Sequence, residues 1–143
     1  MSGGGLPITE RGVLWLGQTC NLCCHFCYFQ NRIKDVHHPD HPFMALDKAK
    51  AICSGLREHY GNTAVDIQGG EPTIYPEILE LVAHCRAIGL APTLITNALA
   101  LADRARCEAL REAGVADLLI SVHGLGEVYD TAVGVRGASA KQR

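Results

Sequence analysis

Four cysteines occur within eight residues near the start of the chain: Cys20, Cys23, Cys24 and Cys27. Thiolates are soft ligands, and cysteines this close together suit a metal site far better than a disulfide framework. Three of them, Cys20, Cys24 and Cys27, have the spacing Cys-x3-Cys-x2-Cys. At the cysteine frequency of this sequence, that spacing should occur by chance only roughly 0.02 times, so it carries information about function.

The neighbouring Cys23 leaves other interpretations open. All four thiolates could hold zinc or a closed iron–sulfur cluster, giving a binding domain without catalysis. A single Cys-x2-Cys pair could also be a redox centre. Structural zinc pairs usually have a longer spacer between them. On a helix, Cys24 and Cys23 lie equally close to Cys20 and Cys27, within about 60°, so local geometry does not choose the ligands.

A second segment that could take part in chemistry is Gly69-Gly70-Glu71-Pro72. It follows residues 64–68, which alternate in polarity and predict a strand. Glycines lack a Cβ atom, so the backbone can bend sharply and approach a ligand closely. Two glycines alone are weak evidence, because turns use them often. Their place at the end of a predicted strand, downstream of the cysteine loop, is more specific.

Together the two motifs resemble the radical S-adenosylmethionine (radical SAM) superfamily. Clusters of the 4Fe–4S type usually have four cysteine ligands, and the resemblance implies that Cys20, Cys24 and Cys27 hold three irons while SAM chelates the fourth. An electron from the cluster then breaks the sulfonium–carbon bond, and the 5′-deoxyadenosyl radical takes a hydrogen atom from an unknown substrate. Cys23 is then a neighbour and not a ligand, and an external flavodoxin- or ferredoxin-like protein supplies the electron.

The resemblance also implies which residues bind SAM. They lie in the glycine segment, before the last cluster cysteine and after the third and fourth predicted strands: Phe26, Gly69, Gly70, Glu71, Pro72, Thr96, Asn97 and Ser121. In the family the glycine segment lines the methionine amino group, and Glu71 could favour this ammonium through its side chain or its backbone. Phe26 would pack near the adenine. Thr96 and Ser121 could equally make ordinary strand-end hydrogen bonds.

The elements that would position these residues alternate along the chain. Strands are predicted at 12–18, 64–68, 91–95 and 116–122, with helices beginning near residues 46, 76 and 103. Such alternation implies right-handed crossovers and a parallel sheet, with all strand ends at one rim. The fold class predicted is therefore α/β: a partial (β/α) TIM-like barrel with about four of the six strand–helix units of the family barrel.

The expected domain organisation follows from this pattern. Residues 1–11 should be a flexible N-terminal segment, residues 12–135 the N-terminal portion of the radical SAM core, and residues 136–143 a truncated end. A fourth helix should be starting near Gly134, so we expect a fragment of a longer protein. Its fourth strand would expose an unpaired edge, which is an aggregation liability. We therefore expect this stretch alone to bind a cluster but to be poorly stable and to lack turnover.

Composition limits the class of protein. The chain has 143 residues, of which 48% are hydrophobic and 20% charged, which fits one globular domain and excludes a disordered chain. The net charge of −2 gives no electrostatic reason to expect binding to nucleic acid or to an anionic membrane. No apolar run reaches membrane-spanning length. Scattered, odd-numbered cysteines favour the reducing cytoplasm.

Other residues of ligand type have simpler interpretations. His37, His38 and His41 are predicted to lie in a solvated, proline-stiffened loop, although a histidine metal site would use the same residue types. The remaining cysteines fall on apolar helix stripes, where a free cysteine packs as a small hydrophobe: Cys53, Cys85 and Cys107.

Overall fold

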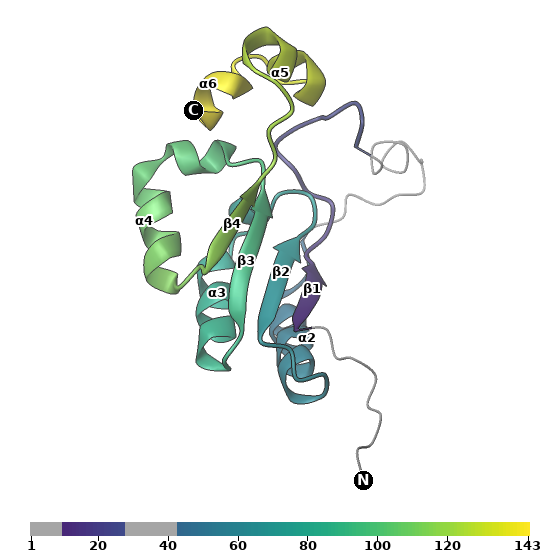
Figure 1. Cartoon of the computed structure of the whole chain (residues 1–143), viewed down its shortest axis with the longest axis vertical. Helices are drawn as coiled ribbons and strands as arrows, with labels where there is room; N and C mark the ends of the chain where they lie inside the picture. Colours follow the sequence, from purple (N-terminus) through teal and green to yellow (C-terminus); the bar gives the residue numbers. More distant parts are fainter. Residues whose placement is uncertain (1–9, 28–42) are drawn as a thin grey trace.

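The computed structural model describes residues 10–27 and 43–143. Four parallel strands within this range form one sheet in the order β1-β2-β3-β4 (Figure 1). The strands are β1 (Arg11–Trp15), β2 (Ala64–Gln68), β3 (Ala91–Thr96) and β4 (Asp117–Ile120). Strands adjacent in sequence are adjacent in the sheet, so all four carboxyl ends lie at one edge, as predicted. The three loop histidines, His37, His38 and His41, lie outside the described residues.

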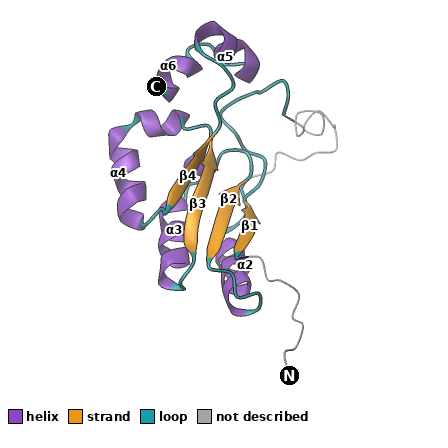
Figure 2. Cartoon of the chain, in the orientation of Figure 1, coloured by secondary structure: helices purple, strands orange, loops and turns teal. Residues whose placement is uncertain are grey.

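Among the described residues, one α-helix follows each of the first three strands (Figure 2). These are α2 (Leu46–Glu58), α3 (Ile78–Ala87) and α4 (Arg104–Ala113), and short 3-10 helices, η1 (Pro72–Ile74) and η2 (Leu99–Ala102), precede α3 and α4. Helix α2 packs on β1, α3 packs on β3 and α2, and α4 packs against α3. The α/β prediction is confirmed. None of the helices in the described part of the chain combines the length and apolar character that crossing a membrane requires.

The core lies between the sheet and these helices. Alternate strand residues point toward the helices, where Leu14, Val65, Ile67 and Leu94 are fully or almost fully buried. Helix residues complete this core, including Ala49, Cys53, Leu81, Val82, Cys85 and Leu110. The predicted packing of Cys53 and Cys85 is confirmed, since both are fully buried with their sulfurs 3.6 Å apart. Cys107 is only half-buried.

The opposite face of the sheet is more polar and more exposed. Val13 was predicted to lie in a buried strand, but its side chain is 54% exposed because it points away from the helices. On the same face the Arg11 guanidinium lies 2.6 Å from Asp66 and donates to Thr93 at 3.1 Å. At the edge of the sheet, all four residues of β4 are exposed, and Leu119 is 58% exposed. The fourth strand thus lies at an exposed edge of the sheet, as predicted from the sequence.

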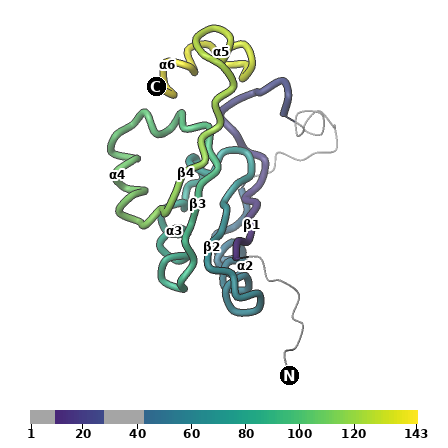
Figure 3. Tube along the Cα trace, viewed as in Figure 1, coloured from purple at the N-terminus to yellow at the C-terminus, as the bar shows by residue number. Residues whose placement is uncertain are grey.

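The C-terminal segment differs from the expectation. The helix after β4 was predicted to start near Gly134, but α5 spans Gly126–Val133 and α6 spans Ala138–Gln142. Gly134 has φ +70°, which is the left-handed conformation that ends a helix, so the sequence signal marked a stop and not a start. Figure 3 shows α5 and α6 together above the carboxyl edge of the sheet. Asp130 joins them by accepting hydrogen bonds from the backbone N–H groups of Gly137 and Ser139.

Candidate active site at the carboxyl edge of the sheet

The cysteine loop begins where the chain runs beside the glycine segment. Past the ends of β1 and β2, the N–H of Gly70 donates to the Gly17 carbonyl at 2.7 Å. The N–H of Glu71 then donates to the Thr19 carbonyl at 2.8 Å. Pairing between the first two strands therefore continues to the residue before Cys20. These hydrogen bonds fix the start of the cysteine loop relative to Glu71.

The two glycines are required by this close pairing. A Cβ atom on Gly70 would lie 2.0 Å from the Thr19 carbonyl oxygen, and one on Gly69 would lie 2.6 Å from the Gly17 oxygen. Gly69 also has φ +135°, where residues with a side chain are strained. The close approach expected from this motif is therefore made, at least in part, by the chain's own residues 17–19.

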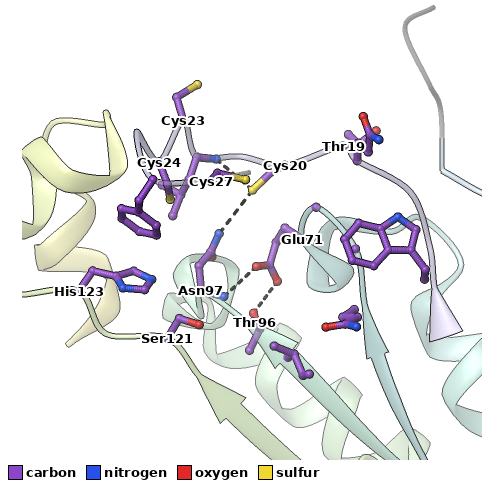
Figure 4. Close-up of a pocket in the computed structure, with 18 residues that line it drawn as sticks. Thr19, Cys20, Cys23, Cys24, Cys27, Glu71, Thr96, Asn97, Ser121 and His123 are labelled. Atoms are coloured by element: carbon purple, nitrogen blue, oxygen red, sulfur yellow. Dashed lines mark hydrogen bonds between the residues drawn. The ribbon is translucent and has the colours of Figure 1, made fainter. Parts of the chain in front are cut away.

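A cavity of about 870 Å³ lies at this edge of the sheet (Figure 4). Most of the residues predicted to form the site line it: Cys20, Cys24, Phe26, Cys27, Gly69, Gly70, Glu71, Thr96, Asn97 and Ser121. Pro72 is the exception, since it is buried at the start of η1. Segments distant in sequence therefore meet around one space, as the parallel topology requires.

The cysteine side chains are not equivalent within the loop. Cys23 also borders the cavity, but in Figure 4 its side chain points away from Cys20, Cys24 and Cys27. Desolvation is the main cause that raises the pKa of the Cys24 thiol, and the charge of Cys27 adds more to this shift than that of Cys23. The orientation of the Cys23 side chain favours the spacing with Cys24 as the middle member.

Cys20 sits at the junction of several groups. The Leu22 N–H donates to its sulfur at 3.4 Å, and the Asn97 side-chain amide lies 3.9 Å from it. Desolvation is the main reason that the pKa of the Cys20 thiol is raised to about 11, with smaller contributions of the same sign from Cys24 and Cys27. A bound cation would favour the thiolate form of Cys20 and so offset this increase in its pKa.

Glu71 is almost fully buried, at 1% exposure, and its carboxylate is satisfied by the protein. Oε1 accepts from the Thr73 N–H at 3.1 Å, the Thr73 hydroxyl at 2.6 Å and the Thr96 hydroxyl at 2.5 Å. Oε2 accepts from the Asn97 N–H at 2.8 Å. The carboxylate therefore connects the segment after β2 to the end of β3.

The end of β3 is organised by its own side chains. The Thr96 hydroxyl accepts from the Ala98 N–H at 3.0 Å while it donates to Glu71. These are strand-end hydrogen bonds, which the sequence analysis gave as the alternative to a contact between Thr96 and SAM. Ala98 has φ +63°, a strained conformation for a residue with a side chain. The Asn97 side chain donates to Asn21 Oδ1 at 2.8 Å and so ties the cysteine loop to β3.

Sequence reasoning assigned no role to several residues of the site, among them Gln18, His123 and Gln142. The His123 ring lines the cavity with its centroid 4.4 Å from that of Phe26. Its position just after the fourth strand was a usable signal, because sites gather at strand ends. Gln142, in α6, donates to the Ser121 carbonyl at 2.6 Å and to the Asn97 carbonyl at 3.2 Å. Nothing in the sequence pattern indicated this contact.

The residues of the cavity fit a metal cluster with an organic ligand beside it. Three cysteines supply soft ligands, and Gln18 Oε1 is buried without a hydrogen-bond partner among the described residues, so it can accept from a bound group. Trp15 and Ile95 supply apolar wall. Within residues 10–27 and 43–143, no three His, Cys, Asp or Glu side chains form a group that could hold a single metal ion.

Comparison with known families gives the class of protein. The family model described as the radical SAM superfamily matches residues 16–143. The match includes the whole cysteine loop, the glycine segment and the ends of β3 and β4. The chain therefore belongs to the radical SAM superfamily.

Several curated enzymes are similar to the chain over most of its length. It is 32% identical over 127 residues to an Fe-coproporphyrin III synthase of Methanosarcina barkeri, covering 88% of this chain and 30% of that protein. It is 32% identical over 139 residues to a PqqA peptide cyclase of Rhodopseudomonas palustris, covering 96% and 35%. A probable GTP 3′,8-cyclase of Thermococcus kodakarensis is 31% identical, with 95% and 42% covered. The chain spans about a third of the length of these relatives.

Solved structures show the same fold. Streptococcus suis SuiB bound to S-adenosylmethionine superposes with a TM-score of 0.71 at 22% identity, covering 93% of this chain and 30% of SuiB. SuiB bound to its precursor peptide SuiA gives a TM-score of 0.71 at 24% identity, with 93% and 29% covered. The partial α/β barrel predicted from the sequence is thus confirmed by its structural neighbours.

Proposed function

We propose that this chain holds a 4Fe–4S cluster through Cys20, Cys24 and Cys27 and binds SAM beside it. The observation that carries the proposal is the convergence of the cysteine loop, the Gly69–Glu71 segment and the ends of β3 and β4 on one cavity, in a chain of this superfamily. The chemistry that such a cluster supplies is reductive cleavage of SAM to a 5′-deoxyadenosyl radical, which abstracts hydrogen from a substrate.

Different residues of the chain are proposed to bind the cluster, to bind SAM and to position these ligands. Cys23 is not a ligand in this proposal, because its side chain points away from the other three cysteines. Glu71 acts as a positioning residue, since hydrogen bonds from Thr73, Thr96 and Asn97 occupy its carboxylate. We therefore assign the contact with the SAM ammonium to the backbone of the Gly69–Glu71 segment, with the unpartnered Gln18 Oε1 as a second acceptor.

The cavity wall would shield this chemistry from water. Phe26 and His123 pack at one side of the cavity with their ring planes tilted by 58°, and Trp15, Leu22 and Ile95 supply apolar surface elsewhere. Excluding solvent tunes a cluster and protects a reactive intermediate. We place Phe26 near the adenine and Ser121 among the SAM contacts.

The complete reaction depends on more than this stretch of chain. An external flavodoxin- or ferredoxin-like protein would supply the electron. The iron–sulfur cluster would make the protein sensitive to oxygen, which fits a reducing cytoplasm. The relatives are named for different products: an Fe-coproporphyrin, a cyclised peptide and a cyclised GTP. The fold does not fix the substrate, and we propose SAM cleavage without assigning a substrate class.

The test is anaerobic reconstitution of the full chain with iron and sulfide. We expect a brown protein with about four irons and four sulfides per chain. Adding SAM should change the electron paramagnetic resonance (EPR) spectrum of the reduced cluster, because SAM binds an iron directly. Formation of 5′-deoxyadenosine from SAM and dithionite would show that this stretch of chain also supports cleavage without the rest of a longer protein. An EPR spectrum of the reduced cluster that does not change when SAM is added would contradict the proposal.

The competing function is a zinc-stapled binding domain without catalysis. It predicts a colourless protein that holds one zinc through all four loop cysteines. The orientation of Cys23 argues against it. Metal analysis of the protein purified without reconstitution separates the two functions directly.

A further inference from the structure

Tyr129, in α5, has an unusual environment for a buried tyrosine. Its side chain is 0% exposed, yet its hydroxyl has no hydrogen-bond partner among the residues that the structure describes. Buried tyrosine hydroxyls normally find a partner. Tyr75, the other buried tyrosine in the described ranges, shows the norm, because its hydroxyl donates to the Met44 carbonyl at 2.9 Å.

The position of Tyr129 is fixed beneath the cysteine loop. It belongs to a small apolar cluster with Leu22 of the loop and Val133 of α5, and Cys24 packs against this cluster. The Cys23 N–H donates to the Val133 carbonyl at 2.9 Å, which holds α5 against the loop. The other members of the cluster are apolar, so they offer the Tyr129 hydroxyl no side-chain acceptor.

The candidate hydrogen-bond acceptors for the Tyr129 hydroxyl are the sulfurs of the loop cysteines. Of the loop cysteines, Cys24 is the one that packs against the apolar cluster that contains Tyr129. Glu71 is already supplied with four donors. A neutral thiol is a weak acceptor, whereas a thiolate that binds iron carries the negative charge that a buried O–H donor favours.

We propose that the Tyr129 hydroxyl donates a hydrogen bond to the Cys24 thiolate when the cluster is bound, and that this bond raises the reduction potential of the cluster. The inference rests on the proposed function. One-electron reduction adds negative charge to the cluster and its thiolates, so a donor to a ligand sulfur stabilises the reduced form more than the oxidised form. Tyr129 is thus a positioning and tuning residue: it touches a cluster ligand but not the substrate.

The test compares two Tyr→Phe variants of the reconstituted full chain. Tyr129→Phe should reduce the equilibrium constant for one-electron reduction by dithionite about tenfold, which is a potential lower by about 59 mV. After exchange into D2O, pulsed EPR of the reduced wild-type cluster should show a deuteron coupling that Tyr129→Phe loses. Tyr75→Phe removes a hydroxyl from the main core and should change neither quantity.

Stability of the cluster-free chain supplies a second readout. Tyr129→Phe should leave the denaturation midpoint unchanged or raised, because no hydrogen bond is lost, whereas Tyr75→Phe should lower it. Loss of the cluster in Tyr129→Phe with an intact cluster-free fold would also support the bond, since the ligand thiolate would have lost its donor. A midpoint lowered as far as in Tyr75→Phe would overturn the inference, because the hydroxyl would then have a partner within the protein.

The outcomes separate this inference from the proposed function. A wild-type chain that assembles no iron and sulfide overturns both. A loaded Tyr129→Phe chain with the wild-type potential and deuteron coupling overturns only the role of Tyr129 and leaves the cluster site standing.

Discussion

The Thr96 hydroxyl donates to Glu71 Oε1 at 2.5 Å, and this contact joins the ends of β2 and β3. The other Glu71 oxygen accepts from the Asn97 N–H at 2.8 Å. Asn97 in turn holds Asn21 of the cysteine loop through its side chain. One buried carboxylate therefore sets the relative positions of the strand ends and, through Asn97, of the cysteines.

Glu71→Gln should destabilise the folded chain when neither cluster nor SAM is bound. An amide nitrogen cannot accept a hydrogen bond, so at least one of the donors from Thr73, Thr96 or Asn97 is left facing another donor. We expect a loss of about 1–3 kcal/mol in the free energy of unfolding, measured by urea denaturation. Glu77→Gln is the control, because Glu77 is exposed and its side chain makes no cap hydrogen bond to α3. Equal effects of the two substitutions would show that the Glu71 network contributes little.

Gly70→Ala should disrupt the pairing between the cysteine loop and the glycine segment. Its Cβ would lie 2.0 Å from the Thr19 carbonyl oxygen, which is backbone and cannot move alone. We expect a loss of about 3 kcal/mol or more, typical of severe overpacking, measured by thermal and urea denaturation. Gly55→Ala in α2 is the matched control: its Cβ meets only His59 at 3.8 Å, and alanine favours a helix by about 0.5–1 kcal/mol. Opposite signs for the two variants are the expected result.

Alanine substitutions in the cysteine loop should divide into two classes. Cys20→Ala, Cys24→Ala and Cys27→Ala should each abolish most of the iron bound after reconstitution, because each removes the ligand of one iron. Cys23→Ala should keep its iron, sulfide and visible absorption. If Cys23→Ala alone lost the cluster while Cys24→Ala kept it, the ligand assignment would be wrong.

Asp130 should make stability depend on pH in the acid range. The backbone N–H groups of Ser139 and Gly137 are the main cause that lowers its pKa below the ordinary value of 3.8. A lowered pKa in the folded state gives stability that is present above the unfolded pKa and is lost as pH falls through the folded one. Between about pH 6 and pH 3, the wild type should therefore lose more stability than Asp130→Asn.

The measurement for Asp130 is urea denaturation across this pH range. Asp47→Asn, at an exposed residue of α2, serves as the control and should follow the wild type. Parallel pH profiles for the wild type and Asp130→Asn would show that the joint between α5 and α6 does not depend on this carboxylate.

Sequence reasoning found the fold because parallel α/β topology leaves a periodic pattern. Alternating residues such as Val65 and Ile67 indicate a strand. Apolar residues at helical spacing, with Cys53 in one helix and Cys85 in the next, indicate the helix faces that cover the sheet. It found the cysteine loop and Gly69–Pro72 because both are local in sequence. The boundaries were less accurate: β1 ends at Trp15 and not at residue 18, because Gly17 has φ +130°, which interrupts regular strand geometry.

The contacts that the sequence did not predict are long-range. Gln142 reaches the Ser121 carbonyl, and Phe26 meets His123, across segments whose pairing depends on the complete fold. Neither contact has a periodic or local signature. Gly134 was misinterpreted for a similar reason. It ends a helix because its φ is positive, and sequence alone does not distinguish this from a loop that precedes a helix.

The hydrogen bonds between the cysteine loop and α5 have a consequence for how this protein matures. Cys23 and His25 donate to the carbonyls of Val133 and Ala132, which leave the ribosome much later than the cysteines do. The nascent loop cannot adopt its final shape until that distant stretch has been synthesised and has docked. If the loop holds the proposed cluster, insertion of iron and sulfur is expected to follow synthesis and docking of residues 132–133.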